Sequence, residues 1–203
     1  MSKLFEGRIT MNICVFGAAS DEIDRIYIEK IEEFGEKMAK RGHNLIFGAG
    51  KFGLMGACAR GVTKAGGKIT GVIPHFFKEN SIEHIYEECD EVIFTDTMAQ
   101  SKAKMEDLAD AFVIVPGGIG TFEEAFEVLT LKQLGRHTKP IAFYDIEGYY
   151  KTLEDMLDIA FNKGFIRSDC KKLYHYCTDS DDVLSYIEND KREKINVLEM
   201  KNG

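Results

Sequence analysis

Short apolar segments alternate with segments of amphipathic helical spacing along the chain, and this alternation constrains the fold more than any other feature. The predicted strands are 12–18, 44–50, 68–74, 91–97, 111–115, 140–144 and 172–177. The predicted helices are 27–40, 54–67, 98–109, 121–134, 149–161 and 181–190. Apolar strands joined by helices form a parallel sheet covered on both faces. The sequence therefore predicts a doubly wound α/β domain with a mostly parallel sheet.

The chain has the length of one domain, because 203 residues bury a sizeable core. Residues 1–11 show no pattern and are predicted to form an N-terminal arm, and the charged residues 191–203 are predicted to form a tail. The segment 75–89 is expected to be irregular. With no internal repeat and no linker composition, residues 12–190 are expected to fold as a single α/β domain.

The charge balance and the cysteines limit the function classes. Lys and Arg number 26 and Asp and Glu number 34, so the net charge of −8 argues against nucleic-acid binding. No apolar stretch has membrane-spanning length, and the N-terminus lacks the apolar core of a signal peptide. The five cysteines form no CxxC pair, which favours free thiols in a reducing cytoplasm over a zinc or redox site. The histidines show no metal-ligand spacing, and we expect neither a metal nor a cofactor.

Three predicted strands end in small or glycine-rich turns, at 17–20, 48–56 and 116–121. Right-handed crossovers place these turns at the same edge of the sheet, where ligands of such folds bind. Glycine lets the backbone approach a ligand closely, and free amides at a helix N-terminus suit phosphate. The predicted phosphate- and substrate-binding residues in the turns are Gly17, Ser20, Gly48, Gly53, Gly117, Gly118, Gly120 and Thr121. The competing interpretation is that these glycines only make tight turns and that Thr121 only caps a helix.

The turn 48–56 contains GxGxxG as Gly48, Gly50 and Gly53, but this match is weak evidence for a dinucleotide site. The dinucleotide motif belongs in the first βα unit and needs an acidic residue at the end of the next strand. Here the motif follows the second strand, and the third strand ends in Ile73 and Pro74. A mononucleotide or sugar phosphate is therefore favoured.

Two acids, Glu123 and Glu124, follow Thr121 and are expected in the first turn of its helix. The helix dipole stabilises negative charge there, which explains one acid well. It does not explain why an acid lies beside a phosphate site. A carboxylate is useful there when the reaction passes through a cation, as cleavage of a glycosidic bond does.

The segment PGGIGTFEE (116–124) resembles the PGGxGTxxE signature of the LONELY GUY family, once widely labelled lysine decarboxylase. The resemblance extends through VFGAAS, GAGKFGLMG, GVIP and QLGRHTKP, from about residue 12 to about residue 190. It implies a Rossmann-like homodimer that hydrolyses nucleoside 5′-monophosphates, including cytokinin ribotides, to a free base and ribose 5-phosphate. It also implies that Glu124 is the catalytic carboxylate, that the PGGIGT glycines and Thr121 hold the phosphate, and that Glu123 and Thr130 line the site. The older label would require a Schiff-base lysine, which nothing in the sequence marks.

One position departs from the family pattern. In MAQSK (98–102), Ser101 stands where the family has an arginine that assists catalysis, while Lys102 is retained. Serine supplies no fixed positive charge. Either Lys102 or another cation (Lys51 or Arg136) compensates, or the hydrolase is slow, altered in substrate or lost. The last case would leave a nucleotide-binding or sensing module with little catalysis. Lys102 is alternatively a solvated residue paired with Glu106 at i+4.

The resemblance also predicts a dimer surface. The apolar helix around Phe126, Leu129 and Leu131 is the candidate contact across a two-fold axis. Aromatic pairs such as Phe76–Phe77 and Tyr149–Tyr150 are interpreted as packing or dimer contacts rather than base-stacking platforms.

Overall fold

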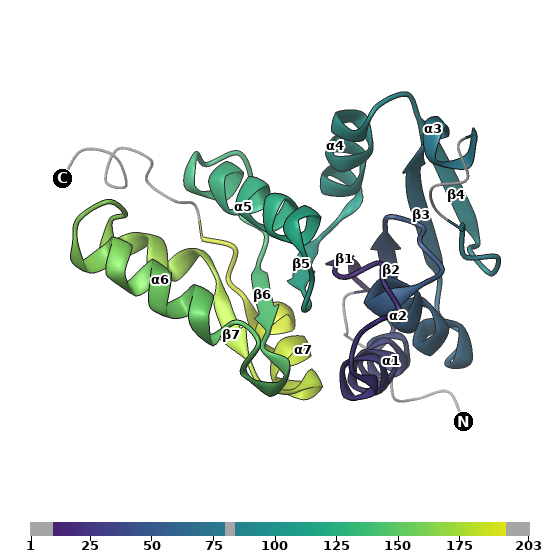
Figure 1. Cartoon of the computed structure of the whole chain (residues 1–203), viewed down its shortest axis with the longest axis horizontal. Coiled ribbons are helices and arrows are strands. Elements are labelled where there is room, and N and C mark those ends of the chain that lie inside the picture. Colours follow the sequence, from purple (N-terminus) through teal and green to yellow (C-terminus); the bar gives the residue numbers. More distant parts are fainter. Residues whose placement is uncertain (1–9, 80–83, 194–203) are drawn as a thin grey trace.

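The sheet is parallel throughout, as a computed structural model that describes residues 10–79 and 84–193 shows. Its strands are β1 Asn12–Phe16, β2 Asn44–Phe47, β3 Ile69–Pro74, β4 Glu91–Thr95, β5 Ala111–Ile114, β6 Ile141–Tyr144 and β7 His175–Cys177. They form a 7-stranded sheet in the order β4-β3-β2-β1-β5-β6-β7 (Figure 1). Each neighbouring pair is parallel. The predicted α/β class is confirmed.

Helices cover both faces of this sheet. They are α1 Arg25–Lys40, α2 Gly53–Lys64, α3 His75–Glu79, α4 Met98–Leu108, α5 Ile119–Gln133, α6 Lys151–Asn162 and α7 Ser180–Asn189, with 3-10 turns η1 Ile146–Gly148 and η2 Ser168–Leu173. Alternate residues of β1 show the two layers. Ile13 packs in the cluster that includes residues of α1, α2 and α7, whereas Cys14 packs in the cluster that includes residues of α4 and α5 (Figure 1). The sheet is therefore doubly wound.

Several predicted boundaries differ from the structure. Strand β2 ends at Phe47 because the chain turns at Ala49, which has a φ of 62°. The segment expected to be irregular contains α3, which begins directly after Pro74 ends β3; residues 80–83 lie outside the described part. The predicted strand at 172–177 begins only at His175, because Ser168–Leu173 forms a 3-10 turn.

The two ends of the predicted domain can be followed only in part. Residues 1–9 and 194–203 lie outside the described residues. Met11, assigned by sequence to the arm, is buried, and its backbone N–H donates to Nδ1 of His43 at 3.3 Å. Met11 therefore packs with the domain.

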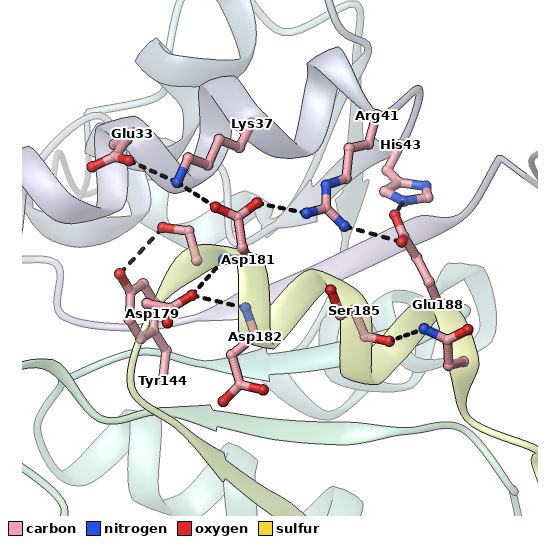
Figure 2. Close-up of polar contacts among 12 residues, drawn as sticks. Glu33, Lys37, Arg41, His43, Tyr144, Asp179, Asp181, Asp182, Ser185 and Glu188 are labelled. Atoms are coloured by element: carbon pink, nitrogen blue, oxygen red, sulfur yellow. Dashed lines mark hydrogen bonds and ion pairs between the residues drawn. The ribbon is translucent and has the colours of Figure 1, made fainter. Parts of the chain in front are cut away.

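The last helix, α7, is joined to α1 by ion pairs (Figure 2). Asp181 pairs with Lys37 at 2.8 Å and with Arg41 at 2.6 Å. Glu188 pairs with Arg41 at 3.0 Å and lies 2.9 Å from Nε2 of the buried His43. These contacts join α7 to the C-terminal end of α1 and to the turn that follows it, on one face of the sheet.

Candidate active site

The three glycine turns meet at the carboxyl edge of the sheet, as predicted. The backbone N–H of Ala18 donates to the carbonyl of Pro116 at 3.1 Å, and the N–H of Leu54 donates to the carbonyl of Ala18 at 2.8 Å. Strand β1 lies between β2 and β5. From β1 the strand order runs through β2 and β3 to β4 on one side and through β5 and β6 to β7 on the other, so the order reverses at β1. Such a switch point is where open α/β sheets bind ligands.

A cavity of about 320 Å³ opens at this switch point. It contains polar groups from all three turns and from the start of α4. The predicted site residues that line it are Gly17, Gly48, Ser101, Gly118, Gly120, Thr121 and Glu124. Residues that are distant in the sequence thus lie around one small space.

The backbone at the start of α5 faces this cavity without a side-chain cap. The N-cap is Gly118, and because glycine has no side chain, no side-chain group caps the helix there. The first amides of a helix have no partner within it, so those at 119–121 are free to bind an anion. A Cβ atom added to Gly118 or Gly120 would meet no atom within 4 Å, whereas one on Gly117 would lie 2.2 Å from Oγ1 of Thr121. Gly118 and Gly120 therefore leave space for a ligand, and Gly117 leaves space for Thr121.

The helix starts earlier than the sequence predicts. Because Ile119 is its first residue, Thr121 lies inside the first turn, where its side chain is buried, and does not cap the helix. Glu123 and Glu124 consequently lie in the second turn, and the first turn contains no acid. The helix dipole falls off beyond the first turn, so it explains these acids less well than expected.

Glu124 lines the cavity three residues after Thr121, on the same side of α5. Burial raises the pKa of Glu124 to about 8, the charges of Glu123 and Glu127 raise it as well, and Lys102 opposes them. Within the described residues, the Glu124 carboxyl group makes no hydrogen bond or ion pair. It is thus free to face a ligand, and near neutral pH it holds a proton.

Lys102, on α4, pairs with two acids of α5 other than Glu124. Its Nζ atom contacts Glu123 and lies 2.7 Å from Oε2 of Glu127. Burial works to lower the pKa of Lys102, but hydrogen bonds to the two glutamates outweigh this and raise it. The alternative pairing with Glu106 is wrong, because the acids of α5 take its place.

Ser101 is buried and its Oγ atom lies 2.5 Å from Oγ1 of Thr95. It therefore contributes a hydroxyl group, and no charge, to the cavity. Lys51 pairs with Glu87 at 3.0 Å. Of the residues that the structure describes, no lysine, arginine or histidine lines the cavity. Lys51, Lys102 and Arg136, the candidates for replacing the family's arginine, therefore do not line the cavity, although the charge of Lys102 still acts on Glu124.

The sequence of this chain matches a known family over most of its length. A family model described as "Possible lysine decarboxylase" matches residues 55–187. A cytokinin riboside 5′-monophosphate phosphoribohydrolase, LOG2 of Arabidopsis thaliana, is 35% identical over 176 residues, covering 87% of this chain and 82% of its own. The chain belongs to the LONELY GUY family.

A second LONELY GUY relative, the probable cytokinin riboside 5′-monophosphate phosphoribohydrolase LOGL5 of Oryza sativa subsp. japonica, is 34% identical over 176 residues. The match covers 87% of this chain and 71% of the relative. Among solved structures, the molybdenum cofactor carrier protein of Chlamydomonas reinhardtii has a TM-score of 0.67 at 20% identity, covering 91% of this chain and 100% of its own. At that identity the likeness shows a shared fold.

Several residues predicted for the LONELY GUY site lie outside the cavity. Ser20 and Gly117 line a neighbouring cavity of about 430 Å³, where Tyr149 donates to the carbonyl of Gly117 at 2.5 Å. Gly53 has a φ of +61°, and a Cβ there would lie 2.3 Å from the carbonyl oxygen of Ala18, so it allows close packing of the turns. Thr130 lines a third cavity of about 550 Å³, beside α6.

The apolar wall of the cavity was not predicted from the sequence. Met55 on α2, Phe77 on α3, and Met98 and Met105 on α4 line it together with the end of β3. Phe77, which the sequence suggests is a packing or dimer residue, lines the cavity in the structure. The signal for these methionines was their apolar character at helical spacing, which equally fits a core position.

None of the helices within residues 10–79 and 84–193 is both long enough and apolar enough to cross a membrane.

Proposed function

We propose that this chain hydrolyses the N-glycosidic bond of nucleoside 5′-monophosphates, AMP or an N6-substituted AMP such as a cytokinin ribotide, to free base and ribose 5-phosphate. The names of its relatives support this activity. The observation that carries it is the position of Glu124, which shares one cavity with the uncapped start of α5. One ligand can therefore contact both the amides that would bind its phosphate and the carboxylate that would react.

The two ends of the cavity suit the two ends of such a substrate. We propose that the amides at 119–121 and the Thr121 hydroxyl group bind the 5′-phosphate. The base then lies against the apolar wall formed by Met55, Met98 and Met105. The bond between C1′ and the base comes beside Glu124, whose carboxylate stabilises the positive charge that develops on the sugar and orients water.

This chemistry uses a carboxylate and water, so we expect no cofactor and no metal for it. We also expect a homodimer, on the family resemblance. Phe126 is 37% exposed and suits a contact surface, whereas Leu129 is 8% exposed and belongs to the core. Light scattering at micromolar concentration tests the dimer. The free cysteines suit the cytoplasm, where we propose that the protein acts.

The requirement for the 5′-phosphate tests the proposed hydrolase. AMP and adenosine are each incubated with the full chain, and the free adenine is measured by chromatography. Because phosphate binding energy positions the glycosidic bond, adenine release from AMP should exceed that from adenosine by orders of magnitude. Equal rates on both substrates, or no adenine from either, would argue against the proposal.

A nucleotide-binding module with little catalysis is the second candidate, and the buried Ser101 favours it. Ser101 lines the cavity, so Ser101→Arg should bring a cation to it. If charge limits turnover, Ser101→Arg should release adenine about tenfold faster or more, and Ser101→Met should not. AMP binding in calorimetry without adenine release, unchanged in Ser101→Arg, would favour the binding module.

A further inference from the structure

The last strand and the last helix bring three potential metal ligands together, away from the proposed active site. His175 and Cys177 lie two residues apart on β7 and therefore on the same face of this edge strand. Asp182 lies in the first turn of α7. One ligand atom from each residue lies within 4.8 Å of the others.

The three residues differ in burial, so the site would have one buried ligand and one ligand exposed to solvent. Cys177 is fully buried, Asp182 is partly buried, and His175 is exposed. The His175 ring stacks on the ring of Tyr186, with centroids 5.0 Å apart, which restricts how the imidazole turns. A metal ion can thus reach the three donors from solvent on the His175 side.

Asp182 differs from its neighbour Asp181 in having no cationic partner among the residues that the structure describes. Asp181 is directed to α1, where Lys37 and Arg41 neutralise it, whereas the Asp182 carboxylate extends from α7 away from these ion pairs (Figure 2). Asp182 forms no salt bridge with any residue in 10–79 or 84–193. Instead, its carboxylate lies close enough to the Cys177 thiol to hydrogen-bond with it. A partly buried carboxylate that has no cationic partner is stabilised when it binds a metal ion.

The set of donors selects the kind of cation. A thiolate, an imidazole and a carboxylate are the ligands of Zn²⁺ and of Co²⁺, its spectroscopic substitute, whereas Mg²⁺ and Ca²⁺ prefer oxygen. Three protein ligands leave a fourth tetrahedral position for water.

We propose that His175, Cys177 and Asp182 form a binding site for a Zn²⁺-class transition-metal ion, with water as the fourth ligand. On binding, the Cys177 thiol gives its proton to solvent and the sulfur becomes a ligand. The site joins the edge of the sheet to α7. It is separate from the proposed hydrolysis, and a failure of either proposal leaves the other standing.

Titration of the reduced 203-residue chain with Co²⁺ tests the site. The wild type should develop a thiolate-to-cobalt absorption band in the near ultraviolet that saturates at one equivalent and disappears on addition of Zn²⁺. His175→Ala should weaken Co²⁺ binding by more than about tenfold, because a direct ligand is lost. His175 is exposed, so this variant should remain folded. Asp182→Asn should also weaken binding.

Matched variants separate this site from other thiols and imidazoles. Cys177→Ser should abolish the band, whereas Cys89→Ser and His84→Ala, which change residues outside the cluster, should retain it. Since Cys177 is buried, circular dichroism checks that Cys177→Ser is folded, and His175→Ala carries the test where it is not. The proposal is overturned by a wild type without the band, or by a band that His175→Ala leaves at full affinity.

Discussion

At the scale of single residues, the pKa of Glu124 connects the proposed reaction to pH. Burial, with Glu123 and Glu127, raises this pKa to about 8, and Lys102 lowers it. Since the carboxylate is the reacting form, kcat/KM for AMP should rise with pH and level off above about 8. Lys102→Met should shift the rise to higher pH, because it removes the cation that opposes the shift.

The matched control for Lys102→Met is Lys104→Met, two residues along α4 and absent from the causes of the Glu124 shift. It should leave the pH profile in place. A wild-type profile that is flat between about pH 6 and about pH 9 would contradict the assignment of Glu124 as the titrating group.

The same pKa predicts how stability depends on pH. A glutamate in the unfolded chain loses its proton near pH 4.3, whereas folded Glu124 keeps it to about pH 8. Between these values the unfolded chain binds fewer protons, so stability falls as pH rises. Glu124→Gln abolishes this pH dependence. The free energy of unfolding of the variant, relative to that of the wild type, should therefore rise by about 1–3 kcal/mol from about pH 4 to about pH 9. Urea unfolding at both values measures the difference, and a gap that does not grow with pH would contradict it.

At the scale of elements, the start of α5 gives up helix stability at the position where we propose that the phosphate binds. Gly120 is inside the first turn, with open space beside it. Gly120→Ala should therefore stabilise the fold by about 0.5–1 kcal/mol, because alanine suits a helix better. Its methyl group should enter the phosphate site and weaken AMP binding. Calorimetry with AMP and thermal unfolding test both effects, and unchanged affinity would place the phosphate elsewhere.

The contact between α1 and α2 depends on glycine for close approach. A Cβ atom on Gly61 would lie 2.0 Å from the carbonyl oxygen of Glu32, a backbone atom that cannot turn aside. Gly61→Ala should therefore force the two helices apart and lower the free energy of unfolding by about 1–3 kcal/mol. Gly120→Ala is the control in chemical denaturation, since both changes add one methyl group to a helix. Equal stability of the two variants would contradict the close packing.

The elements show how far the sequence predicts this fold. The strands follow from the local alternation of apolar and amphipathic segments, and the common edge of the glycine turns follows from right-handed crossovers between parallel strands. The start of α5 was placed two residues late because Gly118, which has no side chain, serves as the N-cap. The helix α3 was not predicted because its five residues are too few to show a helical periodicity.

At the scale of the whole molecule, the parts of the site that escaped prediction are those that depend on the order of the strands. Lys102 has a local candidate partner in Glu106, yet it pairs with Glu123 and Glu127 on another helix. The methionines of the apolar wall come from α2 and α4, which flank one cavity only because β1, β2 and β3 are neighbours. Local spacing does not contain these tertiary contacts.

The measurement that tests the account most directly is product analysis with AMP, comparing the wild type with Glu124→Gln. The wild type should convert AMP into adenine and ribose 5-phosphate in equal amounts, without added metal. Glu124→Gln keeps the shape of the side chain but not its charge, so turnover should fall by orders of magnitude while calorimetry still detects AMP binding. Undiminished release of adenine by Glu124→Gln would contradict the central role of this carboxylate.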